Sequence, residues 1–290
     1  MKFKNINQWK EKIRKIAKEK NIDVQDVQQR YVLEEFALKI SKSRYRNSIV
    51  LKGGFVVSCL LGIDERRTRD IDFTFNSTIY SLDEIRNILN EIINAKIDSF
   101  FDYELISIRE EQKDDYYTGF SCHIDAVREN TRIHFKLDIS NNTLIYPDSI
   151  QNELDSFFLE ESIVINTYYI ENIIAEKFET TLDRGEFNTR IRDLFDVYFL
   201  YKNNKYLIDE KLLALTIIKV SKERNTYQNL FEFDEIINNL KTSKIFTLNF
   251  NKFLKNNRIF VLKELDEIFN IFMEIHNIVL DYINFSNSII

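Results

Sequence analysis

Apolar positions recur along the chain with two different periods, and the first part of the chain has the period of helices. Residues 5–21 and 23–44 carry apolar side chains at near-helical spacing, which predicts two amphipathic helices. Residues 48–51 form an apolar run that predicts a buried strand or a short helix entering a glycine turn. The apolar residues 55–61 end at Gly62, as in a short helix with a glycine C-cap.

The middle of the chain changes to the period of strands. Residues 70–75 alternate polar and apolar side chains, and a helix is predicted over 82–98. Further strands are expected at 103–109, 119–127 and 131–139. From about residue 168 the pattern is helical to the end. This order indicates an α+β fold, a mixed sheet with flanking helices followed by a helical region. We expect two domains, residues 1–165 with the α/β core and residues 166–290 with helices that contribute to the active site.

Composition limits the class of protein. The 290 residues are 44% hydrophobic and 30% charged, as in a folded protein with a sizeable core. The formal net charge of −6 gives no support for non-specific DNA coating, which needs a basic surface. The charged sequence that follows Met1 and the absence of a membrane-length apolar run favour a cytoplasmic protein without a membrane partner.

The cysteines and histidines carry little signal. Cys59 and Cys122 lie far apart without a CxxC spacing, so we expect two reduced thiols. His123, His134 and His276 show no ligand spacing and are predicted to be ordinary strand or helix residues. Candidate chemistry must therefore come from the charged residues.

Asp70 and Asp72 are the strongest candidates for chemistry. Residues i and i+2 of a strand point to the same side, so the two carboxylates share a small volume. Such a like-charge pair is costly unless a cation lies between its members. Mg²⁺ suits this place because it prefers carboxylate, water and phosphate oxygens. An isolated Asp-x-Asp is more often a solvated surface pair, so the neighbouring residues decide between a metal site and such a pair.

Two features upstream favour a phosphate site beside this pair. Lys52-Gly53-Gly54 supplies a cation and a turn whose N–H groups can approach phosphate oxygens without a Cβ in the way. Arg66-Arg67-Thr68-Arg69 places three cations and a hydroxyl directly before Asp70. A plain turn and a solvated loop explain each feature separately, but their order favours a single site. The nucleotide ligands expected here are Lys52, Gly53, Gly54, Thr68 and Arg69.

A second group of charged residues lies in the predicted C-terminal helices. On a helix, Lys177, Thr181 and Arg184 follow one another at i, i+4 and i+7 and share one face. Such a face beside a metal site would bind a triphosphate, with Lys177 shielding the charge that builds on the transferring phosphate. A structural ion pair between a cation and an aspartate of these helices is the alternative. The residues alone leave both interpretations open. The resemblance to a known family, which these motifs share with the upstream ones, favours function, and it implies Lys177 and Asp193 in catalysis and Arg184, Arg190 and Arg192 in nucleotide binding.

Taken together, these motifs resemble a known family. A Gly-Gly turn, a helix and an Asp-x-Asp strand are similar to the signature of the polymerase-β-type nucleotidyltransferase superfamily. Residues 52–54 and 67–73 resemble, more narrowly, the AbiEii/AbiGii toxin family of nucleotidyltransferases. Residues 173–177, 183–185 and 190–196 resemble the downstream block of that family. The resemblance implies a polymerase-β-like core with a helical C-terminal region.

The superfamily takes a third carboxylate from a later strand. Asp138 fits this place because it is polar among apolar neighbours in a strand pattern, and Asp125 is the alternative. The resemblance then implies that Asp70, Asp72 and Asp138 hold two Mg²⁺ ions, with Mn²⁺ as a possible substitute. One departure concerns Gly54, where the superfamily often has serine. A hydroxyl contact to the phosphates is missing unless Thr68 supplies it.

For function, the resemblance implies transfer of a nucleoside monophosphate from an NTP to RNA, with the tRNA 3′ end as the first candidate acceptor. It also implies a toxin of a toxin–antitoxin or phage-defence system and a neighbouring antitoxin. Two other functions stay open: a transferase of the same fold that modifies a small molecule or a protein hydroxyl, and a catalytically silent nucleotide-binding module. A basic surface near residues 66–69 and 184–192 would favour RNA, and a closed small pocket would not.

Overall fold

Among the residues that the structure describes, seven strands form one mixed sheet in the order β3-β4-β5-β2-β1-β7-β6. The computed structural model describes residues 3–63, 66–76, 81–114, 117–140, 145–257 and 265–288. The strands are β1 (Ile49–Lys52), β2 (Asp70–Phe75), β3 (Asp102–Asp114), β4 (Tyr117–Arg128), β5 (Thr131–Ser140), β6 (Ile150–Leu154) and β7 (Ile163–Thr167). β2 pairs with β5 and β1 with β7 in parallel, and the other neighbours are antiparallel.

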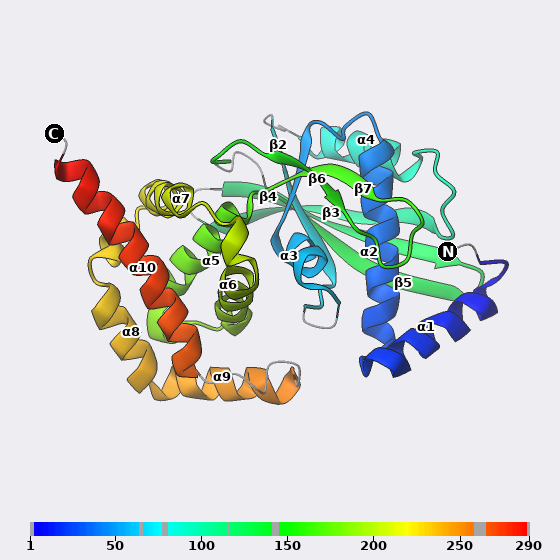
Figure 1. The fold of residues 1–290 in the computed structure, drawn as a ribbon. Coiled ribbons are helices and arrows are strands. Elements are labelled where there is room, and N and C mark those ends of the chain that lie inside the picture. Colours follow the sequence, from blue (N-terminus) through cyan, green and yellow to red (C-terminus); the bar gives the residue numbers. More distant parts are fainter. Residues whose placement is uncertain are drawn as a thin grey trace. The chain divides into compact units, whose positions relative to one another are not determined.

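The chain divides into two compact units, residues 1–143 with 149–168 and residues 144–148 with 169–290. The first unit contains the sheet with α1 (Ile6–Lys20), α2 (Val24–Lys42), α3 (Gly53–Leu61) and α4 (Leu82–Ile93) (Figure 1). The second contains α5 (Ile170–Arg184), α6 (Ile191–Asn204), α7 (Glu210–Glu223), α8 (Phe233–Thr242), α9 (Lys244–Asn256) and α10 (Leu265–Ser288), with the short 3-10 turns η1 (Gly185–Phe187), η2 (Lys205–Leu207) and η3 (Tyr227–Leu230). The predicted α+β fold is confirmed. The helix predicted over 82–98 ends earlier, because Asn94 closes it, and β6 and β7 were not predicted.

Helix α2 lies across one face of the sheet (Figure 1). The ring of Phe36 packs 5.2 Å from that of Phe135 on β5 and 5.4 Å from that of Tyr103 on β3, centre to centre. Almost every side chain from Asp26 to Ser41 is buried, charged ones included. The helix predicted for this segment is confirmed, but its amphipathic character is not, because α2 is covered on nearly all sides.

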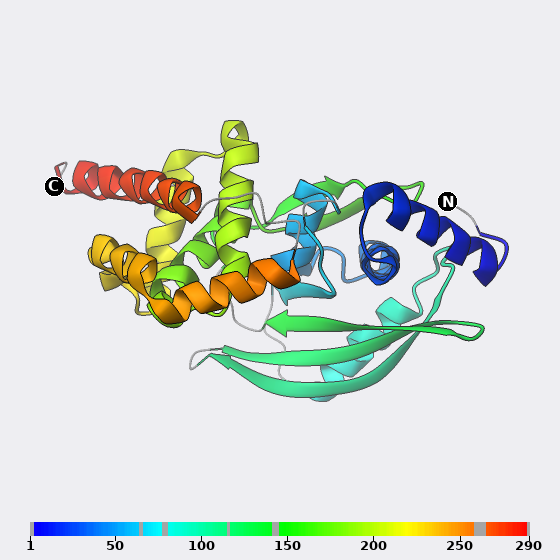
Figure 2. The same cartoon turned by 90° about the horizontal axis from the view of Figure 1, so that it is seen from below.

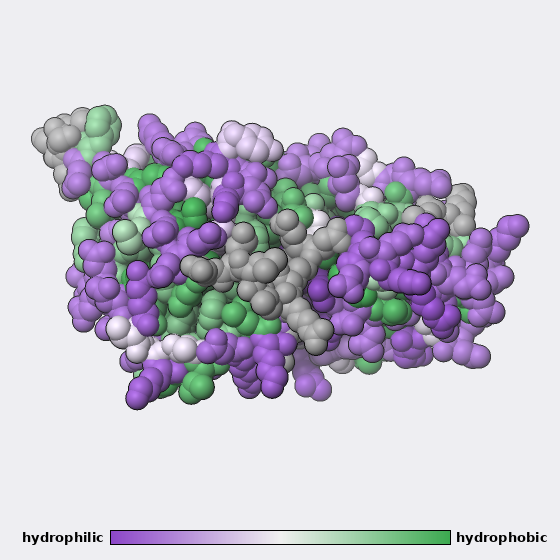
Figure 3. All heavy atoms as spheres, turned by 60° about the horizontal axis from the view of Figure 1, so that its bottom comes forward, coloured by the Kyte–Doolittle hydropathy of each residue, from purple (hydrophilic) through white to green (hydrophobic). Residues whose placement is uncertain are grey.

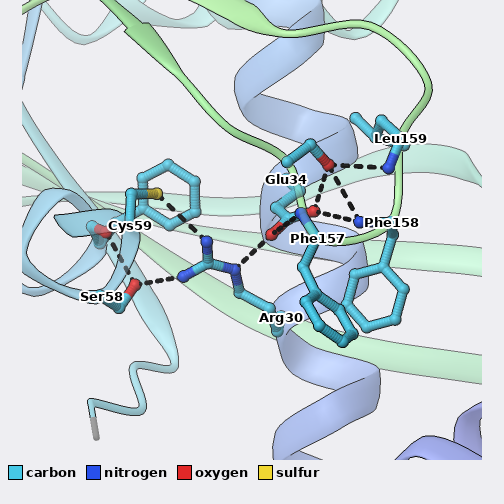
Figure 4. Close-up of polar contacts among 9 residues, drawn as sticks. Arg30, Glu34, Ser58, Cys59, Phe157, Phe158 and Leu159 are labelled. Carbon is cyan, nitrogen blue, oxygen red and sulfur yellow. Dashed lines mark hydrogen bonds and ion pairs between the residues drawn. The ribbon is translucent and has the colours of Figure 1, made fainter. Parts of the chain in front are cut away.

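Arg30 shows how α2 keeps charges in the core (Figure 4). Its Nε lies 2.5 Å from Oε1 of Glu34, one turn along the helix, and its Nη1 donates to Oγ of Ser58 on α3 at 2.5 Å. Glu34 in turn accepts the N–H of Phe158 at 3.1 Å. The guanidinium also reaches Sγ of Cys59, and burial raises the pKa of that thiol to about 11. Cys59 is thus a neutral thiol at neutral pH, and this network fixes α3, the helix after the glycine turn, against α2.

Aromatic side chains form the core of the helical unit. The ring of Phe178 on α5 stacks 5.2 Å from Phe272 on α10 and 6.0 Å from Phe233 on α8. Phe195 on α6 stacks at 5.8 Å on Phe250 of α9. The phenylalanine-rich C-terminal sequence therefore supplies packing between helices that lie far apart in the chain.

The described part of the chain has no helix that is both long and apolar enough to cross a membrane. Figure 3 shows one face of the molecule, where hydrophilic residues cover most of the coloured surface and hydrophobic ones gather in smaller areas.

Candidate active site

β2 and β5 carry the predicted carboxylates side by side. Asp70 and Asp72 are two residues apart on β2 and therefore point to the same side of the sheet. In the parallel pair of strands, Asp72 lies directly opposite Asp138 on β5. The three carboxylates share one face, and all three are partly exposed. Asp125, the alternative third carboxylate, lies one strand further away, on β4.

Lys136 is a cation of the same face that sequence reasoning missed. It lies opposite Asp70, and its Nζ is 3.0 Å from Oδ1 of Asp138. Burial acts to lower the pKa of Lys136, but the hydrogen bond and charge of Asp138, with the charge of Glu111, outweigh it and raise that pKa. Lys136 is therefore charged at neutral pH and offsets part of the negative charge. The only sequence signal was its place two residues before Asp138.

The glycine turn brings the backbone up to Asp72. Gly53 has a φ of +65°, and a Cβ there would lie 2.2 Å from Oδ2 of Asp72, so only glycine fits. The N–H of Gly54 donates to the same oxygen over 3.4 Å. Lys52 lies opposite Asp72 on β1, with its Nζ 5.4 Å from the centre of the Tyr168 ring. The turn thus holds the carboxylate as well as offering N–H groups at the start of α3.

Thr68 fills the space that a side chain at position 54 would take. A Cβ on Gly54 would lie 2.8 Å from Oγ1 of Thr68 and 2.9 Å from Nη2 of Arg66. The same hydroxyl donates to Oδ1 of Asp70 at 2.6 Å. A hydroxyl is therefore present at the turn although the turn residue is glycine. Arg66 is buried, and its place in the sequence had predicted no separate function for this cation.

This geometry predicts a coupling between positions 54 and 68. Gly54→Ser alone is expected to raise the KM for NTP about tenfold, because the new side chain displaces the Thr68 hydroxyl. Adding Thr68→Ala to Gly54→Ser should recover part of that loss, since it removes one of the two close contacts, the other being with Arg66, and the serine supplies the hydroxyl. Steady-state kinetics of the two single variants and the double variant measure the coupling. Strictly additive effects would contradict it.

Arg67 and Arg69 are held by helix α2. Asp26 is buried, and its two oxygens lie 3.0 Å from Nη1 of Arg67 and 3.3 Å from Nη2 of Arg69. Gln29 donates to the carbonyls of Arg69 and His134, at 3.3 and 3.1 Å. These two hydrogen bonds link the residue before β2 to β5. Arg69, a predicted nucleotide ligand, is thus an ion-pair partner of Asp26 whose side chain stays 70% exposed.

The carboxylates of this sheet face suit a magnesium ion that is bound at a partly exposed site. Asp72 and Asp138 place like charges on adjacent strands, and their oxygens are of the kind that Mg²⁺ prefers. Over the described ranges, no three His, Cys, Asp or Glu side chains are grouped closely enough to hold a metal by themselves. An ion bound here would complete its shell with water and substrate phosphates, as Mg²⁺ commonly does. The metal ligands stay a prediction.

In the helical unit, Lys177 lies in a buried ion-pair cluster. Its Nζ is 2.5 Å from Oδ1 of Asp193 and 2.9 Å from Oδ2 of Asp196, both on α6. Arg190 binds the other oxygen of Asp193, with Nε 2.8 Å away. Lys177, Asp193 and Asp196 are all buried. The structural ion pair considered from the sequence is therefore present, and it joins α5 to α6.

The three residues predicted to share one face of α5 differ in burial. Thr181 is fully buried and donates to the carbonyl of Lys177, whereas Arg184, at the end of the helix, is exposed. The helix packs on both α6 and α7, and Arg184 is the last residue of α5, at the end of this shared face. Arg192 donates to Asn257 at 3.2 Å. Of the predicted nucleotide ligands in this unit, Arg184 and Arg190 are exposed.

Comparisons with known proteins cover most of the chain. The family described as nucleotidyl transferase AbiEii toxin, type IV TA system, matches residues 36–270. Among solved structures, the chain is similar to JHP933 from Helicobacter pylori, with 18% identity and a TM-score of 0.51 over 91% of this chain and 96% of that one. A candidate nucleotidyltransferase from H. pylori is similar too, with 16% identity and a TM-score of 0.52 over 91% and 99%. No curated protein matches the chain. At these identities the two structures bear on the fold alone.

Proposed function

This chain belongs to the AbiEii family of nucleotidyl transferase toxins, as its motifs predicted, and we propose that it transfers a nucleoside monophosphate from an NTP to the 3′ end of an RNA, with tRNA as the first candidate. The chain is a nucleotidyltransferase; the metal, the donor and the acceptor are the proposal. The register of β2 and β5 supports it most strongly, because Asp138 lies beside Asp72 on the face that carries Asp70.

Asp70, Asp72 and Asp138 would hold two Mg²⁺ ions. Magnesium bound there would neutralise charge on the triphosphate and lower the pKa of the acceptor hydroxyl. Asp138 accepts the proton of that hydroxyl, whose oxygen then forms a bond to the α-phosphorus. The bond from the α-phosphorus to the bridging oxygen breaks, and pyrophosphate leaves. Lys136 holds Asp138 until the substrate arrives, since their side chains are paired at 3.0 Å.

The glycine turn would bind the triphosphate. Gly53 and Gly54 begin α3, whose N-terminal N–H groups favour anions, and Lys52 precedes them. Thr68 contributes the hydroxyl at this turn. In the helical unit, Arg184 and Arg190 offer exposed cations to the phosphates of a substrate. An antitoxin would be the cellular partner, since the family is one of toxin–antitoxin systems.

Labelled nucleotides test the proposal directly. Purified protein is incubated with total tRNA, Mg²⁺ and each α-³²P-labelled NTP in turn, and label in the tRNA is measured. We expect one or more NTPs to label tRNA, and EDTA to abolish the labelling. A second set without RNA, containing cell-extract proteins or small molecules, tests the other acceptor classes. Label only in that set would replace RNA by another acceptor, and no label anywhere would overturn nucleotidyl transfer by this chain.

A further inference from the structure

The face that carries the three carboxylates continues along β5 and β4 as a polar surface. On β5, His134 and Lys136 precede Asp138 at two-residue steps, so the three side chains point to the same side. On β4, His123 lies directly opposite Lys136, and Asp125 opposite His134. Figure 2 shows β3, β4 and β5 as long strands that run beside one another. The two histidines, predicted to be ordinary strand residues, are thus brought together by the hairpin.

His123 and His134 form one flat surface, which we call the imidazole platform. Nδ1 of His123 lies 2.8 Å from Nε2 of His134, and the ring planes differ by only 17°. A hydrogen bond of this length with ring centres 5.0 Å apart joins the rings edge to edge, not face to face. The platform is therefore wider than a single imidazole, and its ring faces are not used up by mutual stacking.

Asp125 fixes the orientation of both rings. Its Oδ1 lies 2.8 Å from Nδ1 of His134, and its Oδ2 lies 2.5 Å from Nη1 of Arg132. Burial acts to raise the pKa of Asp125, but the hydrogen bonds from Arg132 and His134 outweigh it and lower that pKa, so the carboxylate is ionised and only accepts. Nδ1 of His134 must then carry its proton.

The orientation of His123 depends on its hydrogen bond to His134. Burial and nearby cations lower the pKa of His123, which is neutral at neutral pH. Nδ1 of His123 and Nε2 of His134 share one proton in a second hydrogen bond, which joins the two rings. Each ring is thus held by a directed hydrogen bond, which reduces the conformational entropy lost when a planar ligand binds. The side chain of His134 is 54% exposed, so such a ligand can reach it.

We infer that the imidazole platform stacks a base of the single-stranded acceptor RNA, a step that rests on the proposed function. Single-stranded RNA is commonly bound by stacking its bases on aromatic side chains, histidine included, on an open sheet. His134 lies four residues from Asp138 on β5, about 13 Å along the strand. This distance places the stacked base behind the reacting 3′ end, on the same face as the carboxylates.

Stacking, more than charge, carries this contact. Two of the cations near the platform are already offset, Arg132 by Glu104 and Asp125, and Lys136 by Glu111 and Asp138. The third, Arg109, lies on β3. A site with few phosphate contacts loses little affinity as salt rises. The platform therefore binds the base ring, and its part of the RNA affinity depends weakly on salt.

Alanine and phenylalanine variants separate stacking from other functions. His134→Ala and His123→Ala are expected to raise the KM for the RNA acceptor about 5- to 100-fold. The KM for NTP and the kcat at saturating RNA should stay within about twofold of wild type. His134→Phe should keep most of the affinity, since a phenyl ring also stacks, whereas a function in proton transfer would make it as defective in kcat as His134→Ala. Glu110→Ala is the matched control, because Glu110 is exposed on the opposite face of β3.

RNA binding is measured without NTP or Mg²⁺, so that the test of the imidazole platform does not depend on nucleotidyl transfer. Fluorescence anisotropy of a labelled single-stranded RNA, with thermal melts of each variant, measures affinity and folding separately. If the wild type labels RNA and the alanine variants bind it as tightly, the platform is overturned while the proposed function stands. If no RNA is ever labelled, the proposed function fails. The anisotropy measurement then decides by itself whether the imidazole platform binds RNA. Weaker binding by the alanine variants, restored by His134→Phe, supports the platform, and equal binding overturns it.

Discussion

Asp72→Asn is expected to lower kcat for nucleotidyl transfer by about 10³-fold or more without lowering the stability of the fold. The substitution keeps the shape that fits against Gly53 and removes only the charge. A bound metal contributes several kcal/mol to the transition state, and each 1.36 kcal/mol corresponds to about tenfold in rate. Removing one of three like charges from a single sheet face should leave the melting temperature unchanged or raise it. Labelled-nucleotide transfer and a thermal melt measure the two effects.

Asp155→Asn is the control for this prediction, since Asp155 is an exposed loop carboxylate of the same unit. It should change neither rate nor melting temperature. Should Asp72→Asn keep a tenth of the wild-type rate, Asp72 is no metal ligand. Should its melting temperature fall by many degrees, the carboxylate serves the fold. The combination of a large kinetic effect with an unchanged fold is what separates a site residue from a structural one.

Local periodicity predicted the elements that hold the carboxylates. The alternation at Asp70–Phe75 placed β2 correctly because a strand with one buried face repeats every two residues. The segment 131–139 was predicted as a strand for the same reason, and β5 spans Thr131–Ser140. Helix α2 shows the limit of this reasoning. Its buried charges, such as Arg30 and Glu34, look like a solvated face in the sequence, and only their partners in space reveal a core helix.

Contacts between distant segments could not be predicted from one sequence. The sequence left open whether the turn lacks a hydroxyl or takes it from Thr68. The distance from Thr68 to Gly54 depends on how α3 and the loop before β2 fold back. His123 and His134 showed no spacing of interest because register, set across a β-hairpin, joins them. The ion pair of Arg69 with Asp26 was not predicted either, because the two residues lie 43 positions apart in the chain. These pairings belong to the tertiary structure and leave no local period.

Lys177→Met is expected to lower the free energy of unfolding by about 3–5 kcal/mol, because it leaves buried carboxylates without their cation. Asp193 keeps the guanidinium of Arg190, whereas Asp196, which is 1% exposed, loses the ammonium that lies 2.9 Å from its Oδ2. Urea titration followed by circular dichroism measures the change, since the unit that contains Lys177 is helical. The fluorescence of Trp9, the single tryptophan, reports the other unit and serves as an internal reference.

Adding Asp196→Asn to Lys177→Met should restore part of the stability, because it removes one of the two buried negative charges that the ammonium of Lys177 offsets. Lys177→Arg is the matched control, since it keeps the charge beside both aspartates. If Lys177→Met and the double variant are equally unstable, burial of Asp196 is not the cause. The double variant also separates the two functions considered for Lys177. Where it folds stably and still transfers nucleotide at a normal rate, Lys177 is a structural residue; a large loss of kcat in that folded variant would give it a part in catalysis as well.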